Sequence, residues 1–157
     1  MTAPALTACA GFLVAVLWMD LMFDSQVRGS GNEVLDESVL ASIAGYYHRA
    51  TTTSRPRGAL IAAVMAALLG LLGVHAVIGD APGWLLVVSA ALSGGPILLA
   101  LGRTVPNAVR LGSRRDDPAE QSRLARAVYR DHLICLAGMT AFLLLWVGRT
   151  LGQGLGT

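Results

Sequence analysis

The hydrophobic positions of this chain fall into four long runs that are separated by polar connections. A helix that crosses the hydrocarbon core of a bilayer needs about 20 mostly apolar residues. Each run reaches or approaches that length once the adjoining helix-forming residues are included. The pattern predicts four membrane-spanning helices in a single domain of residues 1–157, at about residues 5–24, 57–79, 84–111 and 118–148.

A fifth helix is predicted in the connection between the first two runs. Apolar residues recur there at helical spacing over about residues 33–50, and Asn32 is placed to cap the first turn. A helix with one apolar face lies on the membrane surface or under the bundle. The predicted fold class is an all-α membrane protein, a four-transmembrane-helix bundle with an additional cytoplasmic amphipathic helix.

Small residues suggest how the spans pack. The second span carries Ala59, Ala63 and Ala67 on one side, a seam that permits close helix approach in lipid and predicts a central position. Gly94-Gly95-Pro96 should bend the third span near mid-membrane. Such a break either lines a cavity or packs on a neighbouring helix. His75, at the outer end of the second span, is expected to lie at the interface.

Charge sets the expected orientation. The chain is 54% hydrophobic and 14% charged, and its twelve basic residues are all arginines. Eleven lie in or beside the connections between spans one and two and between spans three and four; Arg149 lies on the other side. The positive-inside rule then places both connections in the cytoplasm, with both termini and the turn at residues 79–83 outside the plasma (inner) membrane. Acidic residues share the arginine-rich side, so membrane lipids are the expected partner and nucleic acid is not.

Titratable side chains gather at the predicted cytoplasmic ends of all the helices. Because the spans alternate in direction, we expect these groups to surround a single pocket open to the cytoplasm. A polar cluster above an apolar bundle suits a lipophilic small molecule with one polar head. The cluster comprises Asp20, Asp24, Tyr47, His48, Arg103, Asn107, Arg110, Arg130, Asp131 and His132.

The residue types suggest two roles within that pocket. Side chains able to move a proton are the catalytic candidates, and donors able to hold an oxyanion are the candidates for binding a ligand or cofactor head. The first set is His132, Asp131, His48 and Asp20; the second is Arg103, Asn107, Arg110, Arg130 and Tyr47.

His132 is the preferred working residue, since it stands where a charged helix becomes an apolar span. The alternative is that it bonds Asp20 or a backbone carbonyl and only closes the bundle. Asp20 or Asp24 is also expected to form an ion pair with an arginine of another helix, because an unpaired carboxylate at that depth is costly. The candidate arginines are Arg103, Arg110 and Arg130.

A metal site is a competing interpretation of the same residues. Asp20, Asp24, His48 and His132 are ligand types that suit zinc, manganese or non-haem iron. No Glu-x-x-His, His-x-x-x-His or Cys-x-x-Cys pair is present in the sequence, however. The sequence therefore specifies no cofactor.

The order of these features resembles the anthrone-oxygenase-like group of small four-helix membrane proteins. The resemblance rests on the layout around YYHR, VPNAVRL and QSRLARAVYRDHL, with Pro106, Asn107 and Arg130 at the matching positions. It implies an oxidoreductase that acts on polyketide-type aromatic molecules.

Two classes of function remain open from the sequence. The first is a membrane enzyme of oxygenase or other redox type, which binds and oxidises a lipophilic small molecule. The second is a non-enzymatic accessory or structural subunit, in a homo-oligomer or a larger membrane complex, whose polar groups pair with one another and with lipid.

Overall fold

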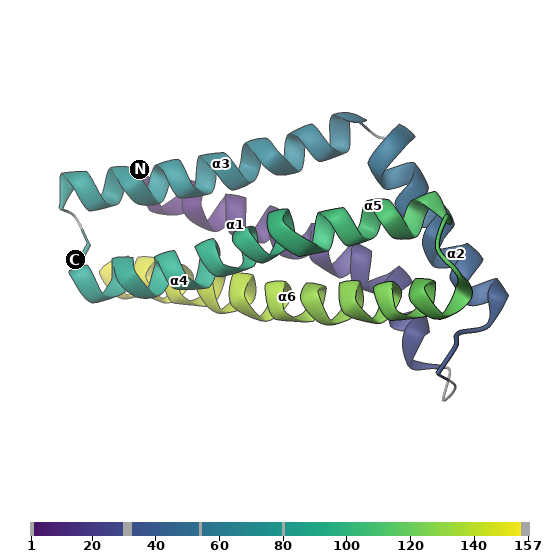
Figure 1. Ribbon diagram of the computed structural model, residues 1–157. Helices are drawn as coiled ribbons and strands as arrows, with labels where there is room; N and C mark the ends of the chain where they lie inside the picture. Colours follow the sequence, from purple (N-terminus) through teal and green to yellow (C-terminus); the bar gives the residue numbers. More distant parts are fainter. Residues whose placement is uncertain (1, 30–32, 54, 80, 155–157) are drawn as a thin grey trace.

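The computed structural model describes residues 2–29, 33–53, 55–79 and 81–154, and these residues are almost entirely helical (Figure 1). The elements in chain order are α1 (Thr2–Asp24), the 3-10 turn η1 (Ser25–Arg28), α2 (Glu37–His48), the π-helical turn η2 (Arg49–Thr53), α3 (Arg55–Ile78), α4 (Gly83–Leu99), the π-helical turn η3 (Ala100–Thr104), α5 (Val105–Ser113) and α6 (Pro118–Gly154). No strand occurs within those ranges.

Four of these helical stretches are long and apolar enough to cross a membrane, which confirms the predicted all-α, four-helix class. The third stretch combines α4, η3 and α5 without interruption. Both marked chain ends and the connection from α3 to α4 lie at one end of the molecule, and α2 lies at the other (Figure 1). The stretches are Ala3–Arg28, Pro56–Ile78, Gly83–Ser113 and Pro118–Gly152.

Helix α6 is the axis of the bundle. Its 37 residues give a length of about 55 Å at 1.5 Å per residue. The carboxylate of Asp117 accepts hydrogen bonds from the backbone N–H groups of Ala119 and Glu120, both at 3.0 Å, so it caps the helix as such side chains do. Helices α1, α2, α4 and α5 all pack against α6.

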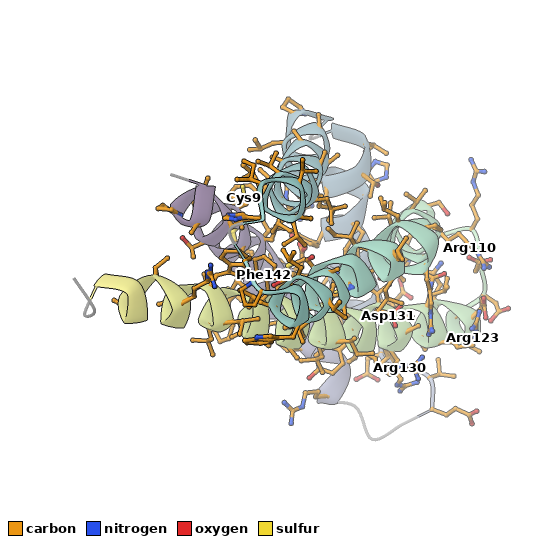
Figure 2. The ribbon with its side chains drawn as sticks, turned by 90° about the vertical axis from the view of Figure 1, so that its left-hand side faces the viewer. Cys9, Arg110, Arg123, Arg130, Asp131 and Phe142 are labelled. Atoms are coloured by element: carbon orange, nitrogen blue, oxygen red, sulfur yellow. The ribbon has the colours of Figure 1, made fainter. Side chains whose placement is uncertain are left out.

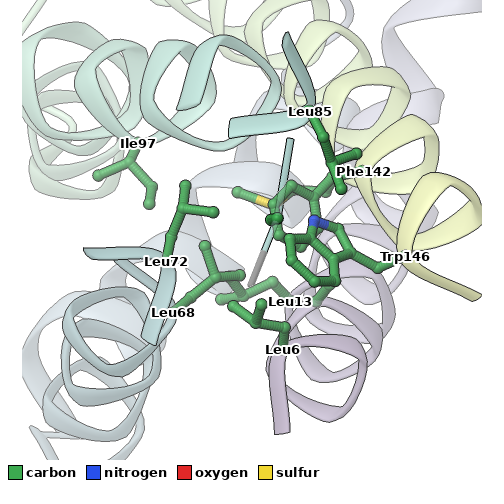
Figure 3. Close-up of a cluster of buried hydrophobic side chains, with 11 residues drawn as sticks. Leu6, Leu13, Leu68, Leu72, Leu85, Ile97, Phe142 and Trp146 are labelled. Carbon is green, nitrogen blue, oxygen red and sulfur yellow. The ribbon is translucent and has the colours of Figure 1, made fainter. Parts of the chain in front are cut away.

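The core within the spans is built around the C-terminal half of α6 (Figure 3). Phe142 and Trp146 are fully buried, and the Trp146 indole N–H donates to Ser89 Oγ at 2.9 Å. The ring of His75 lies 4.9 Å from that of Trp146 and is buried. His75 therefore faces the core of the bundle, and its predicted depth at the membrane interface stays a prediction.

The predicted role of the small-residue seam on α3 is wrong. Ala59, Ala63 and Ala67 are all exposed, and so is Gly70 one turn further on. The seam faces away from the bundle, because α3 is an outer helix that packs on α1 and α4. The central position belongs to α6.

The glycine-glycine-proline break does not end its helix. Pro96 lies inside α4, and the π-helical turn η3 follows four residues later. A Cβ at Gly138 of α6 would lie 2.8 Å from Pro96 Cγ and 3.1 Å from the carbonyl oxygen of Leu92. This oxygen is the one that loses its helical donor to proline. Gly138 therefore allows α6 to approach the break closely.

Helix α2 begins later than predicted. It starts at Glu37 rather than Glu33, and the predicted cap Asn32 lies outside the described residues. The segment before it is held to α6, since the Leu35 N–H donates to Ser122 Oγ at 2.9 Å. One face of α2 is buried against α5 and α6 in a second hydrophobic cluster, and the opposite face is exposed.

Glycine permits the closest of these contacts. A Cβ at Gly112 of α5 would lie 2.8 Å from the backbone nitrogen of His48 and 3.0 Å from the carbonyl carbon of Tyr47. Helices α2 and α5 therefore touch backbone to backbone. This contact fixes the position of the two tyrosines that α2 carries into the site.

Candidate functional site

Asp24, Tyr47 and His132 form a buried hydrogen-bonded cluster where α1, α2 and α6 meet. The Tyr47 hydroxyl donates to Asp24 Oδ1 at 2.6 Å, and His132 Nδ1 lies 2.6 Å from Asp24 Oδ2. All three residues are buried, and Asp24 has no exposed surface. Each oxygen of this carboxylate therefore has its own partner, as a buried charge requires.

The cluster sets the tautomer of His132. A carboxylate that already accepts a bond from the Tyr47 hydroxyl is an acceptor, so the proton between Asp24 and His132 is placed on Nδ1. When the imidazole is neutral, its Nε2 is then a free acceptor. An aspartate holds a general-base histidine in this way in other proteins.

A second cluster lies one turn away, around Asp20. The Tyr46 hydroxyl donates to Asp20 Oδ1, and the Arg57 guanidinium donates to the same oxygen at 2.6 Å. The guanidinium carbon of Arg57 also lies 5.4 Å from the centroid of the Tyr46 ring, and this ring stacks on that of Phe23 at 4.1 Å between centroids. Arg57 thus joins the first turn of α3 to α1 and α2.

Both tyrosines are held in their neutral form. Burial raises the pKa of Tyr47 well above its usual value, and the charge of Asp24 raises it further. Burial also raises the pKa of Tyr46, and its hydrogen bond to Asp20 adds to the effect. Each phenol therefore remains a hydrogen-bond donor to its aspartate over the ordinary pH range.

Asp131 lies outside both clusters, although it precedes His132 in sequence. Its carboxylate is buried and lies 3.1 Å from Arg103 Nε. Among the described residues, neither carboxylate oxygen of Asp131 has a hydrogen bond of good geometry. The contact with Arg103 is therefore an ion pair without a well-aligned hydrogen bond. Asp131 and Arg103 tie α6 to η3.

A cavity of about 130 Å³ lies between the spans beside the two clusters. Its walls are mostly apolar and include Leu17, Met65 and Ile97, so that α1, α3, α4 and α6 all contribute. Its polar side chains are Asp20, Thr104 and His132. The free Nε2 of His132 is therefore the ring nitrogen available to an occupant.

The cavity reaches the outer surface of the bundle between α3 and α5. Val105 lines it and is nonetheless 49% exposed. Within the described residues, α3 packs on α1 and α4 but makes no contact with α5 (Figure 1). The cavity is therefore open to the side of the bundle, between α3 and α5.

The predicted site residues do not surround one pocket. Asp20 and His132 line the cavity. Asp24 binds His132 Nδ1, and Tyr47 donates to Asp24. The prediction of a single pocket is therefore wrong, because Arg103 and Arg130 line a separate groove and the others lie elsewhere. His48 is exposed on α2, Asn107 is half-buried on α5, and Arg110 pairs with Asp116 and Glu120 at 2.9 and 3.2 Å.

The predicted metal ligands do not assemble either. Among the residues that the structure describes, no three His, Cys, Asp or Glu side chains are grouped so as to hold one ion. His48 is exposed, whereas Asp24 and His132 are engaged with each other and Asp20 with Tyr46 and Arg57. The described side chains do not fit a metal centre at these positions.

The prediction that Asp20 or Asp24 pairs with an arginine of another helix is confirmed for Asp20, but the predicted candidate arginines are wrong. Asp20 pairs with an arginine of another helix, but that arginine is Arg57, and Asp24 pairs with His132. Sequence reasoning also missed Tyr46 and Thr104. A usable signal was present for Arg57, since it lies in the first turn of the second span, at the same expected depth as Asp20.

The chain matches no known family model, and no curated protein or solved structure is significantly similar to it.

Proposed function

We propose that this protein is an integral protein of the plasma membrane that binds a lipophilic small molecule in the cavity between its spans. In this proposal the polar head of the ligand is a hydroxyl group that donates to His132 Nε2, with Asp20 and Thr104 beside it. The observation that carries the proposal is that His132 lines an apolar cavity while Asp24 holds its other nitrogen.

The cavity volume indicates the size of the head. An engineered apolar cavity of about 150 Å³ in another protein binds benzene. The cavity of about 130 Å³ thus suits one six-membered ring. A phenol or hydroquinone head on an apolar tail has this size and chemistry. It also agrees with the aromatic substrates that the resemblance to anthrone-oxygenase-like proteins implies.

The chemistry that the described side chains themselves supply is proton transfer. A neutral His132 can take the hydroxyl proton, and the Asp24 carboxylate stabilises the imidazolium that forms. Deprotonation makes a phenol a better electron donor. The enzymatic form of this proposal is oxidation of the bound phenolate by an external oxidant, dioxygen in the case of an oxygenase, which accepts the electrons that the phenolate loses. The α2 end of the bundle is proposed to be cytoplasmic, as the arginine distribution favours.

One observation favours a second candidate, an accessory or structural subunit. The carboxylates of Asp20 and Asp24 already have protein partners at both clusters. In that case His132 closes the bundle and the cavity has no specific ligand.

Paired ring probes decide between the candidates. Fluorine NMR of purified protein in detergent would compare 4-fluorophenol with 4-fluorotoluene, which has the same ring without the hydroxyl. A hydrogen bond to His132 should favour the phenol by about 0.5–1.5 kcal/mol, or roughly 2- to 12-fold. In Asp24→Asn, the amide N–H₂ donates to Nδ1 and moves the imidazole proton to Nε2, so the preference should fall.

Two variants control for the cavity itself. Ala100→Leu narrows it from η3 and should abolish binding of both probes, whereas Ala91→Leu on the exposed side of α4 should leave binding unchanged. Equal affinity for phenol and toluene in the wild-type protein, unaffected by Asp24→Asn, would establish the structural role in place of the binding role.

A further inference from the structure

A second recess, separate from the cavity, lies on the outer side of α6. It is a groove of about 610 Å³ between α6, η3 and the segment before α2. Its walls are charged, and four arginines line it: Arg103, Arg123, Arg126 and Arg130. Figure 2 shows Arg123 and Arg130 with Asp131 on one side of the view, away from Cys9 and Phe142.

The arginines of the groove differ in how far they are already paired. Arg123 forms two hydrogen bonds of 2.6 Å with Glu120, and Arg103 has its ion pair with the buried Asp131. Arg130 has no carboxylate within ion-pair distance among the described residues. An exposed guanidinium without a carboxylate retains all its donors for a ligand.

Charge is distributed unevenly along the groove. The carboxylates of Asp117 and Glu120 lie at the N-terminal end of α6, where Glu120 pairs with Arg123. The other end has Arg130 and Arg103, and the carboxylate paired with Arg103 there is the buried Asp131. Glu33 also lines the groove, beside Arg126, whose guanidinium donates to the Glu33 backbone carbonyl oxygen. An anion would therefore bind at the end formed by Arg103 and Arg130.

That end of the groove borders the apolar surface of the spans. Leu133 and Ile134 follow Arg130 by three and four residues along α6, and they are 42% and 52% exposed. Leu101, two residues before Arg103, is 59% exposed. Such side chains face hydrocarbon if the spans cross a membrane. Arg130 and Arg103 then lie at the boundary between hydrocarbon and headgroups, the level of the phospholipid phosphates.

We propose that the groove is a binding site for the phosphate of an anionic phospholipid, held between the Arg103 and Arg130 guanidinium groups. From Arg130 to Glu120, α6 rises about 15 Å, which exceeds the headgroup layer of roughly 5–8 Å. The glycerol or sugar part of a headgroup would therefore extend along the groove toward Arg123 and Glu120. This site is distinct from the cavity of the proposed function, and either can fail without the other.

Native mass spectrometry of delipidated protein tests the site. The probes are phosphatidylglycerol and phosphatidylcholine, both with palmitoyl and oleoyl chains, added in equal amounts as mixed vesicles. Wild-type protein should retain phosphatidylglycerol preferentially. Arg130→Gln should lower that preference about tenfold, since one charge-assisted contact to phosphate is lost. This variant breaks no ion pair, so its melting temperature should stay near that of the wild type.

The matched control is Arg115→Gln, which removes the same charge from an exposed residue outside the groove. It should leave the lipid preference unchanged, and Arg130→Lys should give an intermediate preference because it keeps the charge but not the planar fork. An equal loss in Arg115→Gln and Arg130→Gln would show general surface charge and overturn the site. Binding of inorganic phosphate with no preference between the two lipids would identify a soluble phosphate as the ligand and overturn the lipid assignment.

Discussion

The hydroxyl of Tyr47 offers a direct test of the buried cluster. It donates to Asp24 at 2.6 Å in a place where the aspartate has no exposed surface. Tyr47→Phe removes this hydroxyl and keeps the ring, including its edge contact with Tyr46 at 5.2 Å between centroids. The carboxylate then keeps only its contact with His132.

The expected cost follows from burial and charge. A hydrogen bond to a charged group contributes about 1.5–3 kcal/mol, and a buried acceptor left without its donor costs its full desolvation. We therefore expect Tyr47→Phe to lower the free energy of unfolding by about 1.5–3 kcal/mol. Tyr46→Phe is the matched comparison: Asp20 keeps Arg57 and is 14% exposed, so a loss of only about 0.5–1.5 kcal/mol is expected.

The measurement is reversible unfolding in mixed micelles of mild detergent and dodecyl sulfate, followed by circular dichroism. Wild type and the two phenylalanine variants would be titrated under the same conditions. An equal cost for the two substitutions, or a Tyr47→Phe protein as stable as wild type, would refute the assignment of Asp24 as a buried, ionised acceptor.

Three further predictions concern packing, pH and orientation. Gly112→Ala should lower the free energy of unfolding by about 1–3 kcal/mol, because the added Cβ would clash with the α2 backbone. The control is Gly73→Ala on α3, where an added Cβ would meet nothing within 4 Å; in the same titration it should be neutral or slightly stabilising. Because the pKa of Tyr47 is raised in the folded state, the stability it contributes is complete below its unfolded pKa of 10.0. Above that pH, stability should fall by about 1.4 kcal/mol per pH unit more in wild type than in Tyr47→Phe, as pH titration of unfolding would show. In intact cells, an impermeant thiol reagent should label a cysteine at Gly83 and not one at Ser113, and the reverse pattern would contradict the proposed orientation.

The helices themselves could be predicted because their signals are local. Apolar runs of sufficient length marked the four spans, and the fourth span was predicted to start at about residue 118, where α6 begins. The start of α2 could not be placed in the same way. Asn32 and Asp36 are both acceptable caps from sequence, and the helix begins after Asp36, where the Leu35 backbone binds Ser122 of α6.

The rotation of the spans about their axes was beyond the sequence. An apolar helix has no polar face to show which side is inward, and lipid is as apolar as a neighbouring helix. The alanine seam of α3 was therefore assigned inward although it faces outward. The expected depth of Arg57 made it a candidate partner of Asp20, but the rotation of α3 that turns Arg57 toward α1 could not be predicted in the same way.

The two aspartate clusters depend on the direction in which α2 runs. Asp20 and Asp24 are about 6 Å apart along α1, yet their phenol partners Tyr46 and Tyr47 are adjacent residues. Adjacent helical side chains point about 100° apart and rise only about 1.5 Å, so they reach both aspartates only if α2 crosses α1 rather than running beside it. Figure 1 shows α2 across the end of the bundle. A displacement of α2 would therefore withdraw both phenols together, and the backbone contact at Gly112 opposes it.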